Sequence, residues 1–275
     1  NENKFAEGLL WIKKQRNISK SILDYVNANY NQKIILKKYE NIYRNVQKKS
    51  SVKPIIFSSS DTAGGAQRAA YRVMLSQLNN NIPSRLFVNR KFSDDKNVFT
   101  PLINHIYIQN RIRSFIGTLI SNYISKKFNK VNFYSLNIIN SPWPKLLNNS
   151  NANIIDLHWF GGESLSIKDV KKIKKNIVYT MHDMWAFSGI EHYDSAYLID
   201  LLDNNKKIVA NNYQYKVFGF DINKWTINRK KKYLRKNIVI SPSHWLAKQI
   251  KKSKVMNDWD IRIIPYPIDL NVFKP

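Results

Sequence analysis

The fold is decided by the stretch Pro54-Ile-Ile-Phe-Ser-Ser-Ser-Asp-Thr-Ala-Gly-Gly-Ala-Gln-Arg-Ala-Ala-Tyr-Arg-Val73. A short apolar run, Ile55 to Phe57, is followed by small polar residues and a turn at Gly64-Gly65. From Ala66 onward, apolar residues recur at positions 66, 69, 70, 73, 74 and 78, which is the spacing of one helix face. The stretch therefore predicts a strand, a glycine turn and a helix.

The glycine turn is a candidate anion site. Glycines let a backbone approach a bound group closely, and the first turn of a helix has free N–H donors. A phosphate or diphosphate held by Gly64, Gly65 and Ala66 would suit such a turn. The alternative is a plain tight turn that binds nothing, because the spacing matches neither the dinucleotide fingerprint nor the P-loop.

The rest of the chain divides near residue 50. Residues 1–50 carry helix-spaced apolar residues, and a polar linker from Gln47 to Ser51 follows them. Residues 51–275 alternate short apolar runs with amphipathic segments, which predicts an α/β fold with a doubly wound, mostly parallel sheet. Strands are expected at 55–57, 85–88, 154–157, 177–181, 237–240 and 261–264, and helices at 66–78, 106–128, 167–175, 222–234 and 243–251.

The longest expected helix, 106–128, is amphipathic. Its polar face is expected to carry Arg111, Arg113, Lys126 and Lys127. Apolar and basic faces together suit a membrane surface, although a helix of the same shape can pack on its own domain.

Composition limits the classes of partner. The chain has 275 residues, 43% hydrophobic residues and a net charge of +26, so an anionic partner is expected unless the composition is simply biased throughout. Cysteine is absent, which fits a cytoplasmic location, and no apolar run is long enough to cross a bilayer. The five histidines lack zinc spacing, so neither a metal nor another cofactor is expected. Nucleic acid is not expected either, because no recognisable reader accompanies the basic runs.

Three motifs follow directly after expected strands. These are Gly64-Gly65, His158-Trp159 and His182-Asp183. Ligands of open parallel sheets bind at the carboxyl ends of the strands, so one crevice could gather all three motifs. A histidine there could exchange protons or bind sugar hydroxyls, and Glu191-His192 is expected to reach the same cleft. The alternative is that each is a satisfied strand-end or helix-cap residue.

Five blocks in this order resemble those of family 4 glycosyltransferases, in the group that makes exopolysaccharide and O-antigen. They are Ser60-Asp-Thr-Ala-Gly-Gly-Ala-Gln-Arg-Ala-Ala-Tyr-Arg72, Ile155-Asp-Leu-His-Trp159, Tyr179-Thr-Met-His-Asp-Met-Trp-Ala-Phe-Ser-Gly189, Ser241-Pro-Ser-His-Trp-Leu246, and Ile263-Ile-Pro265 with Ile268-Asp269 and Phe273-Lys-Pro275. The resemblance covers roughly residues 54–275.

The resemblance implies a Rossmann-like, acceptor-side domain of the two-domain GT-B architecture. It implies that His182 and Asp183 are catalytic, that Gly64, Gly65 and Ala66 approach the donor's diphosphate, and that His158, Trp159, Glu191 and His192 contact substrate. It also implies retention of anomeric configuration without a metal, and a donor-binding domain that would follow Pro275. Residues 1–47 resemble the closing helices of such an enzyme's second domain, so the chain could come from a tandem fusion or a circular permutant.

The expected function is sugar transfer from a nucleotide-diphosphate-sugar to a glycan or lipid-linked acceptor in cell-surface polysaccharide synthesis. The chain alone is expected to be inactive, because the domain that holds the nucleotide base is missing. The expected location is cytoplasmic, with peripheral contact with the anionic inner face of the plasma membrane as an option. The alternative is a non-catalytic module whose basic surface binds glycan or membrane.

Overall fold

The computed structural model describes residues 18–47, 51–101, 104–128, 133–193 and 215–268. The part of the expected helical segment before residue 18, and the blocks at Asp269 and Phe273 to Pro275, lie outside the described residues.

The central sheet is parallel throughout and has seven strands in the order β3-β2-β1-β4-β5-β8-β9. The strands are β1 (Pro54–Ser60), β2 (Arg85–Arg90), β3 (Val98–Phe99), β4 (Ile154–Leu157), β5 (Asn176–Thr180), β8 (Ile238–Ser241) and β9 (Asp260–Ile263). Along the chain, the strands are added outward from β1 to β3 on one side of the sheet and then from β4 to β9 on the other. This is the topology of a Rossmann-like, doubly wound α/β fold. The expected fold class is thus confirmed.

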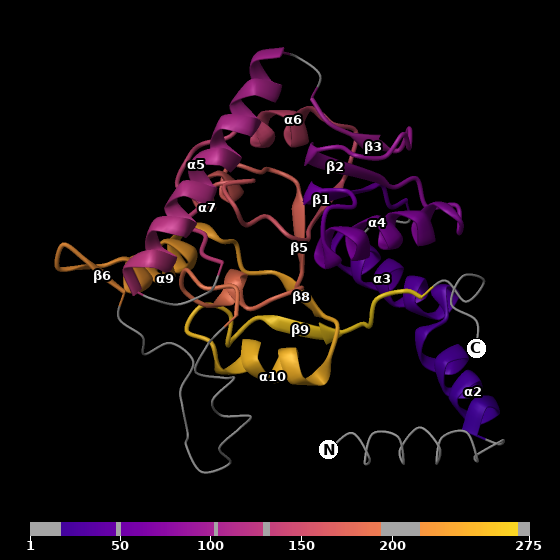
Figure 1. Cartoon of the computed structure of the whole chain (residues 1–275). Helices are drawn as coiled ribbons and strands as arrows, with labels where there is room; N and C mark the ends of the chain where they lie inside the picture. The colour runs from indigo at the N-terminus through magenta and orange to yellow at the C-terminus, as the bar shows by residue number, and fades with distance from the viewer. Residues whose placement is uncertain (1–17, 48–50, 102–103, 129–132, 194–214, 269–275) are drawn as a thin grey trace, which may run out of the picture.

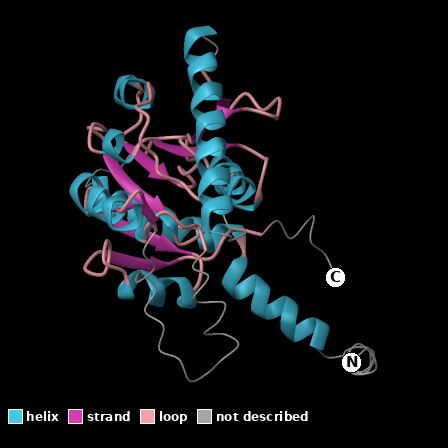
Figure 2. Ribbon diagram, turned by 60° about the vertical axis from the view of Figure 1, so that its left-hand side comes forward, coloured by secondary structure: helices cyan, strands magenta, loops and turns pink. Residues whose placement is uncertain are grey.

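Helices cover both faces of this sheet (Figures 1 and 2). One face carries α3 (Gln32–Gln47) and α4 (Gly65–Leu78), and α2 (Ile18–Tyr30) precedes them and projects from the body. The other face carries α6 (Trp143–Asn149), α7 (Ile167–Val170), α9 (Ile222–Tyr233) and α10 (His244–Lys252). The long helix α5 (Asn104–Phe128) runs along the outside of this second layer.

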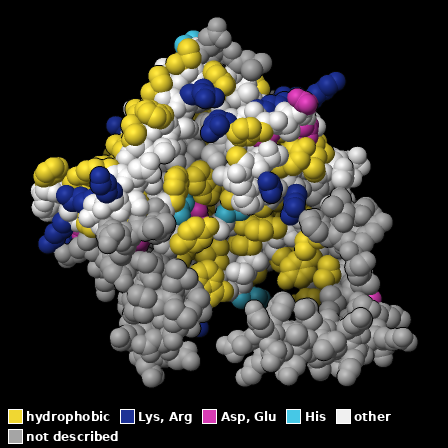
Figure 3. Space-filling view, viewed as in Figure 1, with side chains coloured by type: hydrophobic (Ala, Val, Ile, Leu, Met, Phe, Trp, Pro, Cys, Tyr) yellow, Lys and Arg dark blue, Asp and Glu magenta, His cyan; other side chains and the backbone are white. Residues whose placement is uncertain are grey.

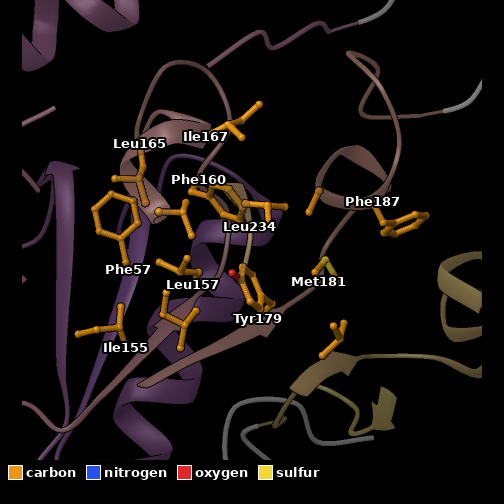
Figure 4. Close-up of a cluster of buried hydrophobic side chains, with 14 of the residues drawn as sticks. Phe57, Ile155, Leu157, Phe160, Leu165, Ile167, Tyr179, Met181, Phe187 and Leu234 are labelled. Atoms are coloured by element: carbon orange, nitrogen blue, oxygen red, sulfur yellow. The ribbon is translucent and has the colours of Figure 1, made fainter. Parts of the chain in front are cut away.

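The two faces of the sheet are filled by alternating strand residues. Ile55, Phe57, Ile155 and Leu157 belong to one buried cluster, whereas Ile56 and Ile154 belong to the other. Figure 4 shows part of the first cluster, in which Phe57, Leu157 and Tyr179 lie near Phe160 and Leu165. Because both faces are covered, the strands read as continuous apolar runs rather than alternating ones.

Several elements differ from the sequence expectation. The helix expected at 167–175 ends at Val170, and the two-residue strand β3 and the short helix α6 were not expected. Two further short strands, β6 (Lys216–Val217) and β7 (Phe220–Asp221), form a hairpin where no strand was expected. These elements are too short to produce a periodic signal in the sequence.

The faces of α5 differ from those expected. Arg113, expected on the polar face, is buried, and its guanidinium donates to the side chain of Asn110 and to the backbone carbonyl of Glu163. Burial lowers the pKa of Arg113 to about 10. Conversely, Ile112, Phe115 and Leu119 are each more than half exposed. Periodicity marked two faces of the helix, but it could not show which one the domain covers.

The carboxylate of Asp156 joins α3 to the sheet. This residue of β4 is completely buried. Its Oδ2 accepts a 2.6 Å hydrogen bond from the Tyr43 hydroxyl, and its Oδ1 accepts a 2.8 Å hydrogen bond from the Thr180 hydroxyl. His158 Nε2 lies 3.4 Å from Asp156 Oδ2. Burial and the nearby carboxylate raise the pKa of Tyr43 well above its ordinary value, so its proton stays on the phenol.

Helix α3 also shares the apolar core with the sheet. Ile35 is 1% exposed and packs in the cluster that contains Ile56 and Ile154. Its neighbour Ile34 is 38% exposed. The division expected near residue 50 therefore does not divide this cluster.

This difference between neighbours gives a test. Ile35→Ala should lower the free energy of unfolding by about 2–5 kcal/mol, because it leaves a cavity in the shared core. Ile34→Ala, the matched control, should change it by about 0.5 kcal/mol or less. Urea unfolding followed by circular dichroism measures both. Equal effects for the two variants would mean that α3 does not pack on the sheet as described.

Candidate functional site

The three motifs expected at strand ends lie at the same edge of the sheet. Gly64 follows β1, His158 follows β4 and His182 follows β5, and these strands are neighbours. Backbone hydrogen bonds continue the pairing past the strands, from Ser59 N to Trp159 O at 3.0 Å and from His158 N to Phe57 O at 3.0 Å. In Figure 3, histidine and acidic side chains lie together at the centre of one face, among hydrophobic ones.

His182 is held at both ring nitrogens. Its Nε2 lies 2.9 Å from His158 Nδ1, and its Nδ1 lies 2.7 Å from the Tyr266 hydroxyl. The same hydroxyl donates to the backbone carbonyl of Met181 at 2.6 Å. If its single proton goes to Met181, Tyr266 accepts from His182 Nδ1–H, and His158 Nδ1–H then donates to His182 Nε2.

The His182 ring is neutral. Burial lowers its pKa well below the ordinary value, His158 lowers it further, and Asp183 opposes the change. The residue as a whole is only partly buried. A ligand could gain a hydrogen bond from a ring nitrogen only by replacing His158 or Tyr266.

Asp183 connects the ends of β4 and β5 to the segment that follows β5. Its Oδ2 accepts from Trp159 Nε1 at 2.7 Å and from His192 Nδ1 at 2.6 Å, and its Oδ1 accepts from the Trp185 amide at 3.0 Å. Burial by itself would raise the pKa of Asp183, but His192 and the hydrogen bonds outweigh it and lower the pKa. The carboxylate therefore fixes the Trp159 ring.

Glu191 and His192 lie behind this surface. Both are buried; Glu191 accepts from the Tyr215 hydroxyl, and His192 Nε2 lies 2.7 Å from Ser135 Oγ. The His192 ring lies between those of Trp159 and Trp185, with centroid distances of 5.2 and 5.6 Å. His192 thus supports the Trp159 ring from the buried side, and the substrate contact expected for Glu191 and His192 stays a prediction.

A buried lysine holds the segment that carries these residues. The Lys230 ammonium, from α9, donates to the backbone carbonyls of Trp185, Ser188 and Gly189. Burial lowers the pKa of Lys230 well below its ordinary value. Three carbonyl acceptors nevertheless match the three donors of an ammonium group.

The glycine turn leaves helix donors open. Gly64 is the N-cap of α4 and makes no side-chain capping hydrogen bond, and the ladder begins with Arg68 N to Gly64 O at 2.9 Å. The amides of Gly65, Ala66 and Gln67 precede that bond and have no partner within the helix. Gly65 is exposed, and a Cβ added there would meet no atom within 4 Å. These amides can therefore face an anion.

A hollow of about 180 Å³ lies beside this helix start. It sits at the β1–β4 pair, where the strand order reverses, and ligands of doubly wound folds bind at that point. Its lining includes the end of β1, the end of β2, part of α5, and Trp159. The residues are Ser59, Ser60, Ala63, Gln67, Arg90, Phe92, Ser114, Thr118, Phe133, Trp159, Gly162 and Ser164.

Of the predicted site residues, Trp159 lines this hollow. The predicted catalytic pair, the predicted diphosphate-binding residues and the other predicted substrate residues are not in its lining: His182, Asp183, Gly64, Gly65, Ala66, His158, Glu191 and His192. Sequence reasoning missed Arg90 and the α5 residues Ser114 and Thr118. Arg90 could have been found, because it closely follows the strand expected at 85–88 and so falls at the same sheet edge. No sequence signal showed that α5 returns to this edge.

The loops that frame the hollow are tied together by Asp61. Its buried carboxylate accepts from the amides of Phe92 and Ser93, the latter at 2.8 Å. Gln67 Nε2 donates to Ser59 Oγ at 2.9 Å. The loops after β1 and β2 thus have fixed positions around the open helix end.

Within the part of the chain that the structure describes, no three histidine or acidic side chains are grouped so that they could hold a metal ion. The described helices include none long and apolar enough to span a bilayer. No protein-family model matches the chain, and no curated protein matches it significantly.

The contacts of Asp183 give a pH-dependent prediction. Because its folded-state pKa lies below the unfolded value of about 4, its contribution to stability is present above pH ~4 and is lost as pH falls through the folded pKa. Asp183→Asn should therefore lower the free energy of unfolding by about 1.5–3 kcal/mol near pH 7. The difference in the free energy of unfolding between this variant and the unchanged protein should become smaller below pH ~4.

Asp260→Asn is the control, since Asp260 is about half exposed and pairs only with Arg262 at the surface among its described contacts. It should change stability by less than about 1 kcal/mol at pH 7. Denaturant unfolding at a series of pH values measures these differences. A gap for Asp183→Asn that stays constant from pH 7 to pH 3 would contradict the assigned role of the carboxylate.

Proposed function

We propose that this chain is the acceptor-side part of a retaining glycosyltransferase. It would take part in transfer of a sugar from a nucleotide-diphosphate-sugar to a glycan or lipid-linked acceptor in cell-surface polysaccharide synthesis. The observation that carries the proposal is the hollow at the strand-order reversal, which is lined by Arg90 and Trp159 and lies next to the start of α4 with its open amides. The resemblance described above supports the same function.

Each part of the hollow suits one part of such a substrate. The open amides of α4 and the guanidinium of Arg90 suit diphosphate oxygens. The Trp159 ring offers an apolar face against which a sugar ring can pack, and Ser59 and Ser60 offer hydroxyls for hydrogen bonds. The helix and Arg90 would provide positive potential where a metal ion often neutralises a diphosphate, so the proposal includes no metal and no other cofactor.

In this proposal the two catalytic candidates have different roles. His182 is neutral and only partly buried, and the proposal gives its ring a contact with the transferred sugar. Asp183 acts through Trp159, whose indole N–H it accepts at 2.7 Å. Asp183 is therefore a positioning residue for the sugar-facing wall.

The nucleotide base would be held by a second Rossmann domain, which the resemblance places after Pro275. This chain alone should then bind nucleotide-sugars weakly and transfer no sugar. Its location would be cytoplasmic, where nucleotide-sugars are made, with peripheral contact with the inner membrane face.

Gly65→Val tests the diphosphate contact. Apart from its chain neighbours and the backbone of its own helix, no atom lies within 4 Å of a Cβ added there, so the thermal midpoint should stay within about 2 °C of the original. Binding of nucleotide-sugars and of pyrophosphate, measured by calorimetry or ligand-observed NMR, should weaken by about tenfold or more, because the new side chain covers the amides. Unchanged binding in this variant, or binding of no nucleotide-sugar by the original chain, would overturn the proposal.

The second candidate function is a non-catalytic basic module that binds a membrane surface. It is favoured by the exposed apolar residues of α5 together with Lys126 and Lys127 in its last turn. The chain should then float with vesicles of phosphatidylglycerol but not with phosphatidylcholine, and the double change Lys126→Gln and Lys127→Gln should reduce flotation. Flotation that is equal with both lipids would argue against this candidate.

A further inference from the structure

A series of polar contacts leads from the buried carboxylate of β4 to the strand-end edge of the sheet. His158 Nε2 lies 3.4 Å from Asp156 Oδ2, and His158 Nδ1 lies 2.9 Å from His182 Nε2. His182 Nδ1 lies 2.7 Å from the Tyr266 hydroxyl, which in turn lies 2.6 Å from the carbonyl oxygen of Met181. We call these five groups the histidine network. Each contact joins two atoms that have lone pairs, so each is favourable only with a proton between them.

The number of protons decides the charge of this network. Its four contacts need four protons. With both imidazoles neutral, the two rings and the phenol of Tyr266 together hold three protons. One contact then brings two lone pairs together without a proton, whichever contact it is. A fourth proton satisfies every contact and gives the two rings one positive charge between them.

The surroundings favour this charge on His158. Its side chain is fully buried beside Asp156, and its Nε2 makes no hydrogen bond of ordinary geometry to any described residue. The Asp156 carboxylate otherwise accepts only from two neutral hydroxyls among its described contacts, those of Tyr43 and Thr180. A proton on His158 Nε2 therefore compensates a buried negative charge. Burial, and then the charge on His158, lowers the pKa of His182, so the second ring stays neutral.

No other cation competes for this carboxylate within the described residues. The other ionisable groups that face the network are Tyr39 and Tyr43 from α3, Asp183 after β5, and Tyr193. Burial raises the pKa of each of these three phenols, so they carry no charge. Asp183 pairs with His192. His158 is thus the cationic partner that the described structure offers to Asp156.

We propose that Asp156, His158 and His182 form a proton relay that delivers a proton from His182 Nδ1 to an oxygen of the bound substrate. Tyr266 is only partly buried and follows β9, so it is the partner of His182 that a substrate oxygen can replace. The inference rests on the proposed sugar transfer, in which an oxygen of the departing diphosphate gains negative charge. Asp156 and His158 are positioning residues, because they act through His182.

The transfer balances in protons and in charge. The N–H bond at His182 Nδ1 breaks as an O–H bond forms on the substrate oxygen. The proton between the two rings moves from His158 Nδ1 to His182 Nε2, so both rings end neutral and His158 Nε2–H still faces Asp156. The positive charge thus leaves the network and neutralises one negative charge on the substrate. The proton that the acceptor hydroxyl releases when its oxygen bonds to the sugar reloads the network.

NMR of the ring nitrogens tests the relay in the unmodified protein. The signals are assigned by changing one histidine at a time to Gln. Near neutral pH, both ring nitrogens of His158 should be protonated, and His182 should carry its proton on Nδ1 alone. A neutral His158, or a His182 with its proton on Nε2, would overturn the proposal. The measurement needs no nucleotide-sugar, so the relay and the proposed sugar transfer can fail separately.

Two aspartate variants test what holds the charge. Asp156→Asn removes the carboxylate that faces His158, so His158 should lose its second proton near neutral pH. Asp183→Asn is the control, because that carboxylate accepts from Trp159 and His192 instead. It should leave His158 doubly protonated. A folded Asp156→Asn protein in which His158 keeps both protons would contradict the relay.

Tyr266→Phe tests the end of the relay that meets the substrate, and it serves equally if Asp156→Asn does not fold. The change removes the hydroxyl at His182 Nδ1 but keeps the ring that stacks on the imidazole at a centroid distance of 5.0 Å. The Nδ1 proton should then exchange with water about tenfold faster or more, while His158 stays doubly protonated. An unchanged exchange rate would mean that this proton does not face Tyr266, and the proposal would be wrong.

Discussion

The structure depends on how one buried charge is satisfied. Asp156 lies in the middle of the sheet with no exposure, where an uncompensated carboxylate would cost several kcal/mol. Its oxygens are met by Tyr43 from α3 and Thr180 from β5, with His158 close by. The carboxylate thus connects helix α3 to strands β4 and β5. It also lies next to His158, which in turn contacts His182.

The same arrangement recurs one strand further along. Asp183 follows β5 and collects donors from Trp159, His192 and the Trp185 amide. Between the two carboxylates lie His158 and His182, joined at 2.9 Å. The polar groups at this edge are therefore engaged with each other, and the open donors lie instead at the α4 start and at Arg90. This edge of the sheet therefore has histidine and aspartate side chains that bond to each other, next to backbone amides that are open to a ligand.

The sequence predicted the parts of the fold that have strong periodicity. Strands around Ile55, Ile154 and Ile177 and the helix after Gly64 could be placed, because buried parallel strands are continuous apolar runs and the helix has a clear apolar face. The order of the strands in the sheet could not be derived, because the residues of a short strand such as β3 do not indicate which strand it pairs with. The burial of Arg113 was missed for a related reason: its partner, the Glu163 carbonyl, comes from a loop fifty residues away.

For the site, the predicted strand ends showed at which edge of the sheet it would lie, but they did not show where the hollow is or what lines it. His182 and Trp159 were located because each follows an apolar run directly. Whether a side chain faces solvent or a hydrogen-bond partner depends on the neighbouring loops, so the inward position of Glu191 and His192 had no signal in the sequence. Arg90 had a positional signal, but its position beside α5 in the lining of the hollow depends on tertiary packing.

The contact between Tyr43 and Asp156 has a consequence for how such genes can recombine. The polar stretch around residues 47–51 resembles a module boundary, yet the phenol on one side satisfies an acid on the other. A crossover there would yield a foldable chimera only if the incoming helix offered a donor at the equivalent position. The helix that carries Tyr43 and the sheet that carries Asp156 should therefore be inherited together, although the polar linker between them resembles a point of exchange.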